Sequence, residues 1–282
     1  MSSTADLPTI VIRPRAGFGG IRIRELWESR FLLLRLARRD LTLRYRQTAL
    51  GVTWVILQPL LAAGVLSFVF GRVAKLEVKG VPYFAFTMSG YVGWSCFSTV
   101  VSKASTSILS NAGMISKVFF PRLLLPLSTV VSTFADVLVG VALLFGTLVV
   151  TGVGISFKIL FLVPLLLGFA ILAFGIGSAL SALAVPYRDI NYVLPVALQL
   201  LLYGSPIAWV LTELSTSQRS LMEFNPLVGL LEGMRWATAT QAKGATAFPT
   251  SALVHSVIIG SVIVVIGLVI FERVERDFAD VI

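Results

Sequence analysis

Few side chains in this sequence are suited to catalysis, and they form no recognisable catalytic set. The chain has one cysteine, Cys96, and one histidine, His255. This excludes a disulfide framework and any metal site built from several cysteines or histidines. The pattern GxxxxGK[ST], whose backbone cradles phosphate, is absent, as are HExxH and CxxC. We therefore expect no metal site, no cofactor on this chain, and no ATP hydrolysis by that route.

Asp136 is the one acid that falls well inside a membrane-length apolar segment. A charged group at the centre of a bilayer helix costs about 2.5–3.5 kcal/mol on insertion scales, so a functional role is the default hypothesis. We expect no cationic partner inside an adjacent segment, since His255 falls near the outer end of the last one. A structural hydrogen bond to another helix is therefore favoured over a proton relay.

Arginines crowd against the start of the first apolar segment, where residues 38–46 read RRDLTLRYR. Over residues 24–46 a helix would place leucines and an alanine on one face and mainly charged side chains on the other. That pattern is typical of a helix lying in the membrane interface. A simple positive-inside anchor explains the charge equally well, but Asp40 among the arginines favours a docking surface for a partner. Guanidinium groups also bind phosphate bidentately.

The elements that must position these residues are membrane helices. Hydrophobic residues make up 56% of the chain, charged residues 13%, and the mean hydropathy is +0.90, which predicts a polytopic membrane protein. Crossing the bilayer takes about 20 helical residues, and backbone groups in lipid must be satisfied within the segment. The sequence predicts an all-α integral membrane protein with an N-terminal tail (1–23), an amphipathic interface helix (24–47) and a membrane domain (48–282) whose six spans are 49–70, 83–102, 123–150, 159–185, 192–211 and 252–271.

The lysines and arginines predict the orientation of these spans. With six spans, 16 of the 23 lie on the side of the two termini and 7 on the other side. Because the more basic side faces the cytoplasm, both termini are expected there. The net charge of +9 then reflects topology and contact with anionic membrane lipids, and we expect no nucleic-acid partner.

Three connections between the spans have unusual sequences. Residues 212–250 contain NPLVGLLEGMRWATA, which is apolar but too short to cross a membrane. We favour re-entrant extracytoplasmic helices here, with a cap on the membrane surface as the alternative. Residues 102–127 are longer than two neighbouring spans need, which favours an exposed contact helix on the cytoplasmic side. Residues 184–195 form a third cytoplasmic turn, with Arg188 beside Asp189.

Five segments resemble, in order, the permease subunits of ABC transporters that export lipid-linked polysaccharide: O-antigen, capsule-type polymers and wall teichoic acid. The first carries Arg-Asp at 39–40, Arg-Tyr at 44–45, Leu-Gly at 50–51, Trp54 and Gln-Pro-Leu at 58–60. The others are SNAGMISKVFFPRLLLPLS, PYRDINYVLP, YGSPIAW and NPLVGLLEGMRW. The resemblance covers the chain from about residue 25 to its end.

The resemblance implies a homodimer with two separate P-loop subunits on the cytoplasmic face, which hold ATP and Mg. It implies that a lipid-linked glycan, most simply of O-antigen type, crosses the inner (cytoplasmic) membrane through a channel at the dimer interface. Channel-lining aromatics, on whose flat faces sugar rings stack, would be Tyr83, Phe84, Tyr91, Trp94, Phe97, Tyr203 and Trp209. Lipid-phosphate contacts would be Arg38, Arg39, Arg44 and Arg46, ATPase coupling would use Asp40, Lys103, Lys117, Arg122 and Arg188, and the extracytoplasmic gate would contain Asn225, Glu232 and Arg235.

Other functions compete with this interpretation. A related permease could export a drug, a lipid or a teichoic acid. A membrane-bound glycan-processing enzyme would need a set of acids or a metal motif, and the outer acids Glu77, Glu213, Glu223 and Glu232 form no such set. A passive channel would not need docking helices on the cytoplasmic side.

Overall fold

The computed structural model describes residues 23–45, 53–78, 80–211, 214–238, 248–276 and 278, and this part of the chain is helical, which confirms the expected all-α fold. The helices are α1 (Ile23–Glu28), α2 (Arg30–Tyr45), α3 (Thr53–Ser67), the π-helix η1 (Phe68–Val73), α4 (Tyr83–Ser110), α5 (Ala112–Ile115), α6 (Leu124–Val150), the 3₁₀ helix η2 (Phe157–Phe161), α7 (Leu162–Leu183), α8 (Ile190–Gly204), α9 (Thr216–Met222), α10 (Pro226–Thr238) and α11 (Thr250–Glu275).

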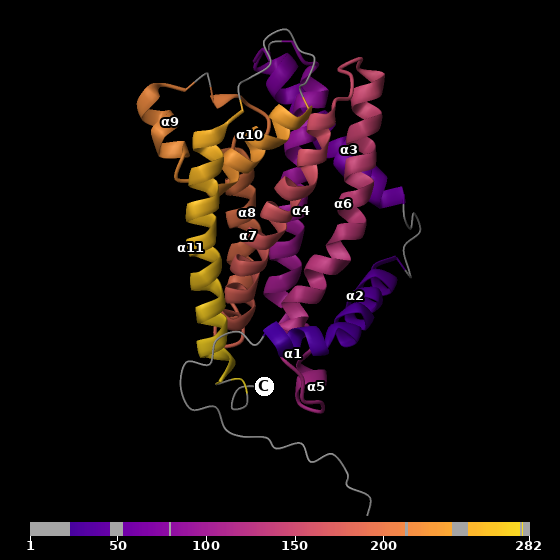
Figure 1. Cartoon of the computed structure of the whole chain (residues 1–282), viewed down its shortest axis with the longest axis vertical. Coiled ribbons are helices and arrows are strands. Elements are labelled where there is room, and N and C mark those ends of the chain that lie inside the picture. The colour runs from indigo at the N-terminus through magenta and orange to yellow at the C-terminus, as the bar shows by residue number, and fades with distance from the viewer. Residues whose placement is uncertain are drawn as a thin grey trace, which may run out of the picture.

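The long helices form a bundle with two distinct ends (Figure 1). We call the lower end the one that carries α1, α2, α5 and the C-terminal end of α11, and the upper end the one that carries η1, α9 and α10. α4 lies at the centre and packs against α6 and α7, while α11 packs against α7 and α2 packs across the lower part of α6.

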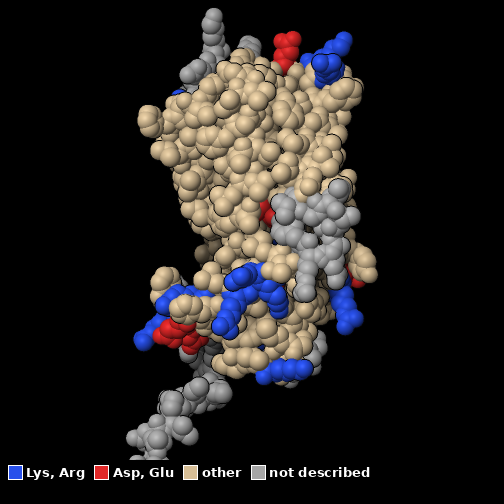
Figure 2. Space-filling view, turned by 90° about the vertical axis from the view of Figure 1, so that its right-hand side faces the viewer, with Lys and Arg blue, Asp and Glu red and all other residues tan. Residues whose placement is uncertain are grey.

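The surface of the bundle is that of a multi-pass membrane protein. Within the described residues, four stretches are long and apolar enough to cross a membrane: Thr53–Val73, Leu124–Val150, Phe157–Leu183 and Thr250–Glu275. On the face that carries α2, the charged side chains gather toward the two ends, chiefly the lower one, and a broad band with only a small acidic spot separates them (Figure 2). Such a band is what a hydrocarbon layer about 30 Å thick requires.

Local sequence explains where several helices begin and end. α6 stops at Gly152, whose φ of +70° places it in the left-handed region. The Val153 N–H then donates to the Leu148 carbonyl at 3.1 Å, closing a Schellman motif. At the start of α10, the Asn225 side-chain oxygen accepts a hydrogen bond from the Leu227 N–H at 3.0 Å, as an N-cap does.

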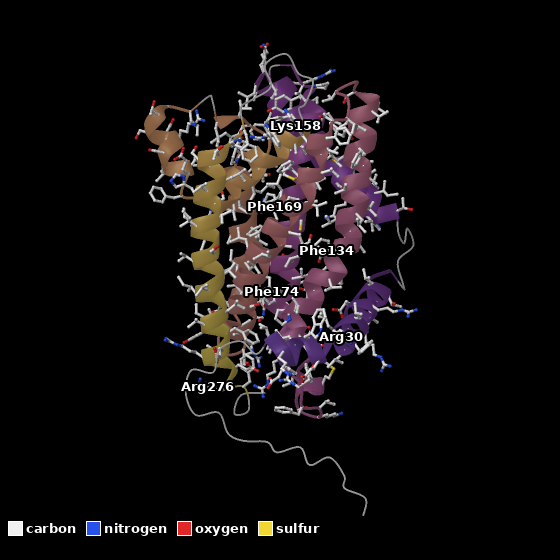
Figure 3. All side chains as sticks on the ribbon, viewed as in Figure 1. Arg30, Phe134, Lys158, Phe169, Phe174 and Arg276 are labelled. Atoms are coloured by element: carbon white, nitrogen blue, oxygen red, sulfur yellow. The ribbon has the colours of Figure 1, made fainter. Side chains whose placement is uncertain are left out.

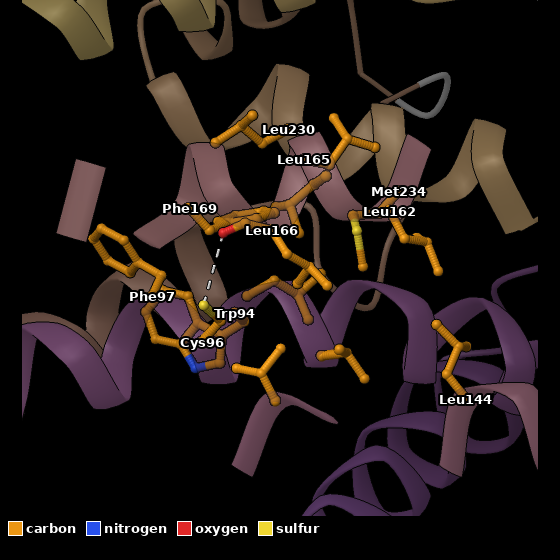
Figure 4. Packing of buried hydrophobic residues seen from close by; sticks show 14 of the residues in the cluster. Trp94, Cys96, Phe97, Leu144, Leu162, Leu165, Leu166, Phe169, Leu230 and Met234 are labelled. Carbon is orange, nitrogen blue, oxygen red and sulfur yellow. Dashed lines mark hydrogen bonds between the residues drawn. The ribbon is translucent and has the colours of Figure 1, made fainter. Parts of the chain in front are cut away.

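A main core cluster joins α4, α6, α7 and α10 (Figure 4). Its helices approach closely because glycines face bulky neighbours, which is how membrane helices pack in the absence of a strong hydrophobic drive. A Cβ on Gly93 of α4 would lie 2.6 Å from the Phe169 ring of α7, and one on Gly177 of α7 would lie 2.6 Å from the Ala104 Cβ of α4. Larger residues at either glycine would push α4 and α7 apart.

Two helices differ in length from the spans that the sequence predicts. α4 continues to Ser110 instead of ending near residue 102, because Ala104 and Ile108 of this stretch are fully buried against neighbouring helices. Hydroxyls in the stretch bond their own helix carbonyls, as Ser105 does to Ser102 at 2.8 Å. α8 ends at Gly204, although the predicted span runs to residue 211. Pro206 follows directly and supplies no N–H to continue the helix.

Candidate functional site

An irregular segment at the upper end, Ser205–Trp209, is mostly buried although it is not helical. Its backbone carbonyls need hydrogen-bond partners, because non-helical backbone at membrane depth is tolerated only where protein or water satisfies it. Neighbouring side chains from α4 and α10 supply these partners.

Arg235 of α10 is the principal partner. Its Nη2 donates to the carbonyls of Pro206 and Trp209, the latter at 3.0 Å, and its Nη1 donates to Glu232 Oε1 at 2.5 Å. The guanidinium also lies 4.0 Å from the centroid of the Phe86 ring, a cation–π geometry. Arg235 is only 7% exposed. Burial lowers the pKa of Arg235 and the Glu232 carboxylate opposes that shift, but a guanidinium starts so far above neutrality that it stays protonated.

Two further side chains hold the same segment. The Tyr83 hydroxyl, from α4, donates to the Ala208 carbonyl. The Asn225 amide donates to the Ser205 hydroxyl at 3.0 Å. The side chains predicted to form an extracytoplasmic gate therefore meet around one segment, with Tyr83 beside them. We call this set, Tyr83, Asn225, Glu232 and Arg235, the upper clamp.

The aromatic residues predicted to line a channel lie in different surroundings. Trp94 and Phe97 are buried in the main core cluster, inside a single chain (Figure 4). Tyr83 belongs to the upper clamp, and Phe84, Tyr91 and Trp209 are half-buried. Tyr203 is 53% exposed on α8. Their role as channel lining stays a prediction, and Tyr203 is the member most open to a ligand or a second copy.

α8 differs from the other long helices because none of its residues is buried in the described chain. Tyr192 is 80% exposed, and Gln199 is exposed between it and Tyr203. Tyr192 is absent from the predicted aromatic set. Its position about three helical turns below Tyr203, on the same face of the same apolar segment, is the signal that would have found it.

The predicted interface helix is formed by α1 and α2 at the lower end. Leu36 and Ala37 face the protein and are buried, while Trp27 and Phe31 are exposed. The guanidinium of Arg30 lies 5.6 Å from the Trp27 ring and 4.7 Å from the Phe31 ring, and Figure 3 places it at the lower end. Exposed aromatic rings beside a cation suit the membrane interface.

Of the four predicted phosphate-binding arginines, two have described side chains. Arg38 is exposed. Arg39 donates to Asn111 Oδ1 at 2.7 Å and pairs with Asp40 at 3.1 Å, which ties α2 to the end of α4. Arg46 lies outside the described residues, and the structure describes only the backbone of Arg44.

The residues predicted to couple to an ATPase fall into two groups. Lys117 and Arg188 are exposed, while Asp40 pairs with Arg39. Lys103 and Arg122 point inward: Lys103 lies within α4, and Arg122 donates to the Glu275 carbonyl of α11 at 2.7 Å.

The expectation that Asp136 has no cationic neighbour is wrong. The Nζ atom of Lys103 lies 3.4 Å from Asp136 Oδ2 and 3.4 Å from the Thr133 hydroxyl. The sequence predicts that the second span ends at residue 102, whereas α4 remains helical through Lys103 and brings it beside α6. His255 instead lies with its Nδ1 2.8 Å from the Ser251 carbonyl.

Taken together, the helical fold and the apolar surface define a multi-pass helical membrane protein. Within the described residues, no group of three or more His, Cys, Asp or Glu could hold a metal ion.

The chain belongs to the ABC-2 type transporter family, whose model matches residues 32–238. It is the transmembrane permease subunit of a transporter and not an enzyme, and permeases of this family work with ATP-binding subunits.

Within this family, the chain is related to permeases that are named for polysaccharide export. The chain is 26% identical over 252 residues to the O-antigen export system permease protein RfbA of Klebsiella pneumoniae, covering 89% of this chain and 95% of the relative. It is 29% identical over 211 residues to the protein of that name from Myxococcus xanthus, covering 74% and 80%. It is 26% identical over 204 residues to the polysialic acid transport protein KpsM of Escherichia coli, covering 71% and 78%.

Proposed function

We propose that this chain forms the membrane part of an ATP-driven exporter that moves a lipid-linked polysaccharide, of O-antigen type, across the cytoplasmic membrane. Two copies would enclose the channel, and two ATP-binding subunits would sit on the cytoplasmic face. The names of the relatives support the substrate class, since two of those cited are O-antigen permeases and one is a polysialic acid transporter.

Six crossings are proposed, with α4 and α8 added to the four long apolar stretches. The 28 residues of α4 measure about 42 Å at 1.5 Å per residue, which is ample for a bilayer. The 15 residues of α8 measure only about 22 Å, and Ser205–Trp209 continues the path upward. The lower end would face the cytoplasm because the arginine-rich α2 lies there, together with the C-terminal end of α11.

The observation that carries a channel between two copies is the surface of α8. A helix that exposes Tyr192, Gln199 and Tyr203 places two hydroxyls and an amide where lipid could not hydrogen-bond them. A second copy and a water-filled path between the copies would satisfy these groups, and the tyrosine rings would offer flat faces to passing sugars.

The lower end supplies surfaces for the remaining partners. Arg38 and the rest of the basic segment 38–46 would meet the phosphate groups of the lipid carrier, and the exposed Lys117 and Arg188 would face the ATP-binding subunits. The upper clamp would hold the extracytoplasmic end of the channel closed between export events.

Reconstituted transport tests the proposal. The permease would be co-purified with its ATP-binding subunit and placed in vesicles with a lipid-linked O-antigen-type glycan. We expect ATP-dependent translocation that falls at least severalfold with Tyr192→Ala plus Tyr203→Ala. Phe157→Ala is the control, since Phe157 is even more exposed than either tyrosine but lies on η2. ATP-driven movement of a simple lipid or a drug without any effect of the glycan would reject the proposal.

A further inference from the structure

A second hydrophobic cluster closes the lower end of the bundle and contains the last described residue of the chain. It joins α2, α4, α6, α7 and α11 with the residue beyond α11 through Leu36, Ile108, Phe120, Leu123, Leu124, Leu125, Ala182, Val185, Phe271 and Phe278. Phe278 is 1% exposed, and its ring meets that of Phe271 at 89° with centroids 6.2 Å apart. Phe278 lies after the last predicted span, among charged residues, and its burial shows that this position beyond α11 packs into the protein.

Arg122 links this C-terminal end to the start of α6. Its Nη1 donates to the Glu275 carbonyl at 2.7 Å, and its guanidinium carbon lies 5.3 Å from the centroid of the Phe278 ring. The carbonyl belongs to the last turn of α11, where helix carbonyls lack partners within the helix and the helix dipole favours a cation. Both contacts direct the guanidinium inward, away from any docking partner.

The segment that Arg122 anchors is the most exposed apolar tip of the lower end. Residues 116–119 are exposed, and Phe119 is 85% exposed beside Lys117. The next residue, Phe120, is buried in the lower cluster, and Arg122 follows Pro121. The tip is therefore held at its base by two adjacent anchors, Phe120 in the cluster and Arg122 on the C-terminal end.

We propose that the region around Phe278 supports the surface that receives the ATP-binding subunit from behind, with Arg122 and Phe278 as positioning residues for the tip 116–119. The tip presents one cation next to Val118 and Phe119, so it fits a pocket on the partner with an apolar floor and a carboxylate at its rim. This inference rests on the proposed function for the identity of the partner. The contacts that hold the tip are independent of it.

A probe on the tip tests the positioning without the partner. The single native cysteine, Cys96, is buried, so Lys117→Cys in a Cys96→Ser background accepts one nitroxide label. We expect Phe278→Ala to increase the mobility of this label in nanodiscs, because the Arg122 guanidinium loses the ring that packs on it. Phe278→Trp, which keeps an aromatic face for the cation, should restore the wild-type spectrum. Phe157→Ala, at the upper end, should leave it unchanged.

Binding of the permease to its ATP-binding subunit tests the docking. We expect Phe278→Ala, and removal of residues 277–282, to weaken this binding by about two- to thirtyfold, the range that loss of one cation–π contact gives. Arg122→Lys keeps the charge but loses the planar guanidinium, so we expect a smaller loss. Monodisperse elution of each variant as the wild-type species shows that the fold is intact.

The outcomes separate the two proposals. Unchanged label mobility in folded Phe278→Ala would overturn the positioning role, whatever the partner does. Increased label mobility with undiminished binding would overturn the proposal that the positioned tip docks the ATP-binding subunit. Failure of the wild-type permease to bind the ATP-binding subunit at all would reject the proposed function, while the label would still decide whether the C-terminal end holds the tip.

Discussion

Replacing Arg235 with methionine would test whether the upper clamp holds the irregular segment in place. Methionine has a similar length and fills much of the same space, but it donates no hydrogen bonds. The substitution would remove the partners of the Pro206 and Trp209 carbonyls and the countercharge of Glu232.

The expected loss of stability in Arg235→Met follows from these contacts. Breaking a buried ion pair by removing one partner costs about 3–5 kcal/mol, because the other charge is left uncompensated. Each orphaned buried carbonyl adds about 1–3 kcal/mol where water cannot reach it. Taking the ion-pair figure as a lower estimate, the apparent Tm should fall by roughly 6–20 °C, since about 1 kcal/mol shifts Tm by 2–4 °C in a chain of this size.

Thermal unfolding in detergent, followed by size-exclusion chromatography of the folded fraction, would measure the shift. Arg235→Met plus Glu232→Gln provides the informative comparison, because it removes the stranded carboxylate and should recover part of the loss. Glu232→Gln alone should cost less, because its amide oxygen still accepts from Arg235. A shift below about 2 °C for Arg235→Met, less than 1 kcal/mol by the same conversion, would refute the view that these contacts hold the segment.

Three further predictions concern other contacts. Asp136→Asn should destabilise the fold by about 1–3 kcal/mol because it removes the negative charge that faces Lys103. Adding Lys103→Met should cost less than the sum of the single changes in a double-mutant cycle. Gly267→Ala should cost about 1–3 kcal/mol because the new methyl would overlap the backbone of α7, whereas Gly146→Ala, which meets no neighbour within 4 Å, should be neutral or stabilising in the same melting assay. Lys117→Glu should reduce binding of the ATP-binding subunit at low salt without changing Tm. An unchanged affinity would show that the Lys117 charge takes no part in docking.

The sequence predicts the membrane class and most helices because apolar runs of spanning length are few and well separated. It also predicts the buried side of the interface helix, since Leu26, Leu33 and Ala37 recur at helical spacing and are half-buried or buried in α1 and α2. These features depend on local pattern alone.

Features that depend on which helices meet were not predictable in the same way. The Lys103–Asp136 pair requires α4 to continue as a helix through a serine-rich stretch, where propensity is ambiguous and tertiary packing decides. The burial of Trp94 depends on its neighbours in α6 and α7, which a single sequence does not specify. Phe278 gives only a weak signal, an apolar residue among charges, because its site is assembled from five distant elements.

The exposed surface of α8 also affects how the sequence of such a permease can evolve. A substitution at Tyr192, Gln199 or Tyr203 opens no cavity and displaces no neighbour within the chain, because these side chains fill no space in its interior. The helix that would meet the cargo is thus freed from the packing demands that constrain α4 and α7. Descendants of one fold could then acquire different polymers by altering a single unburied helix, while the clamp and the lower cluster keep the rest of the bundle unchanged.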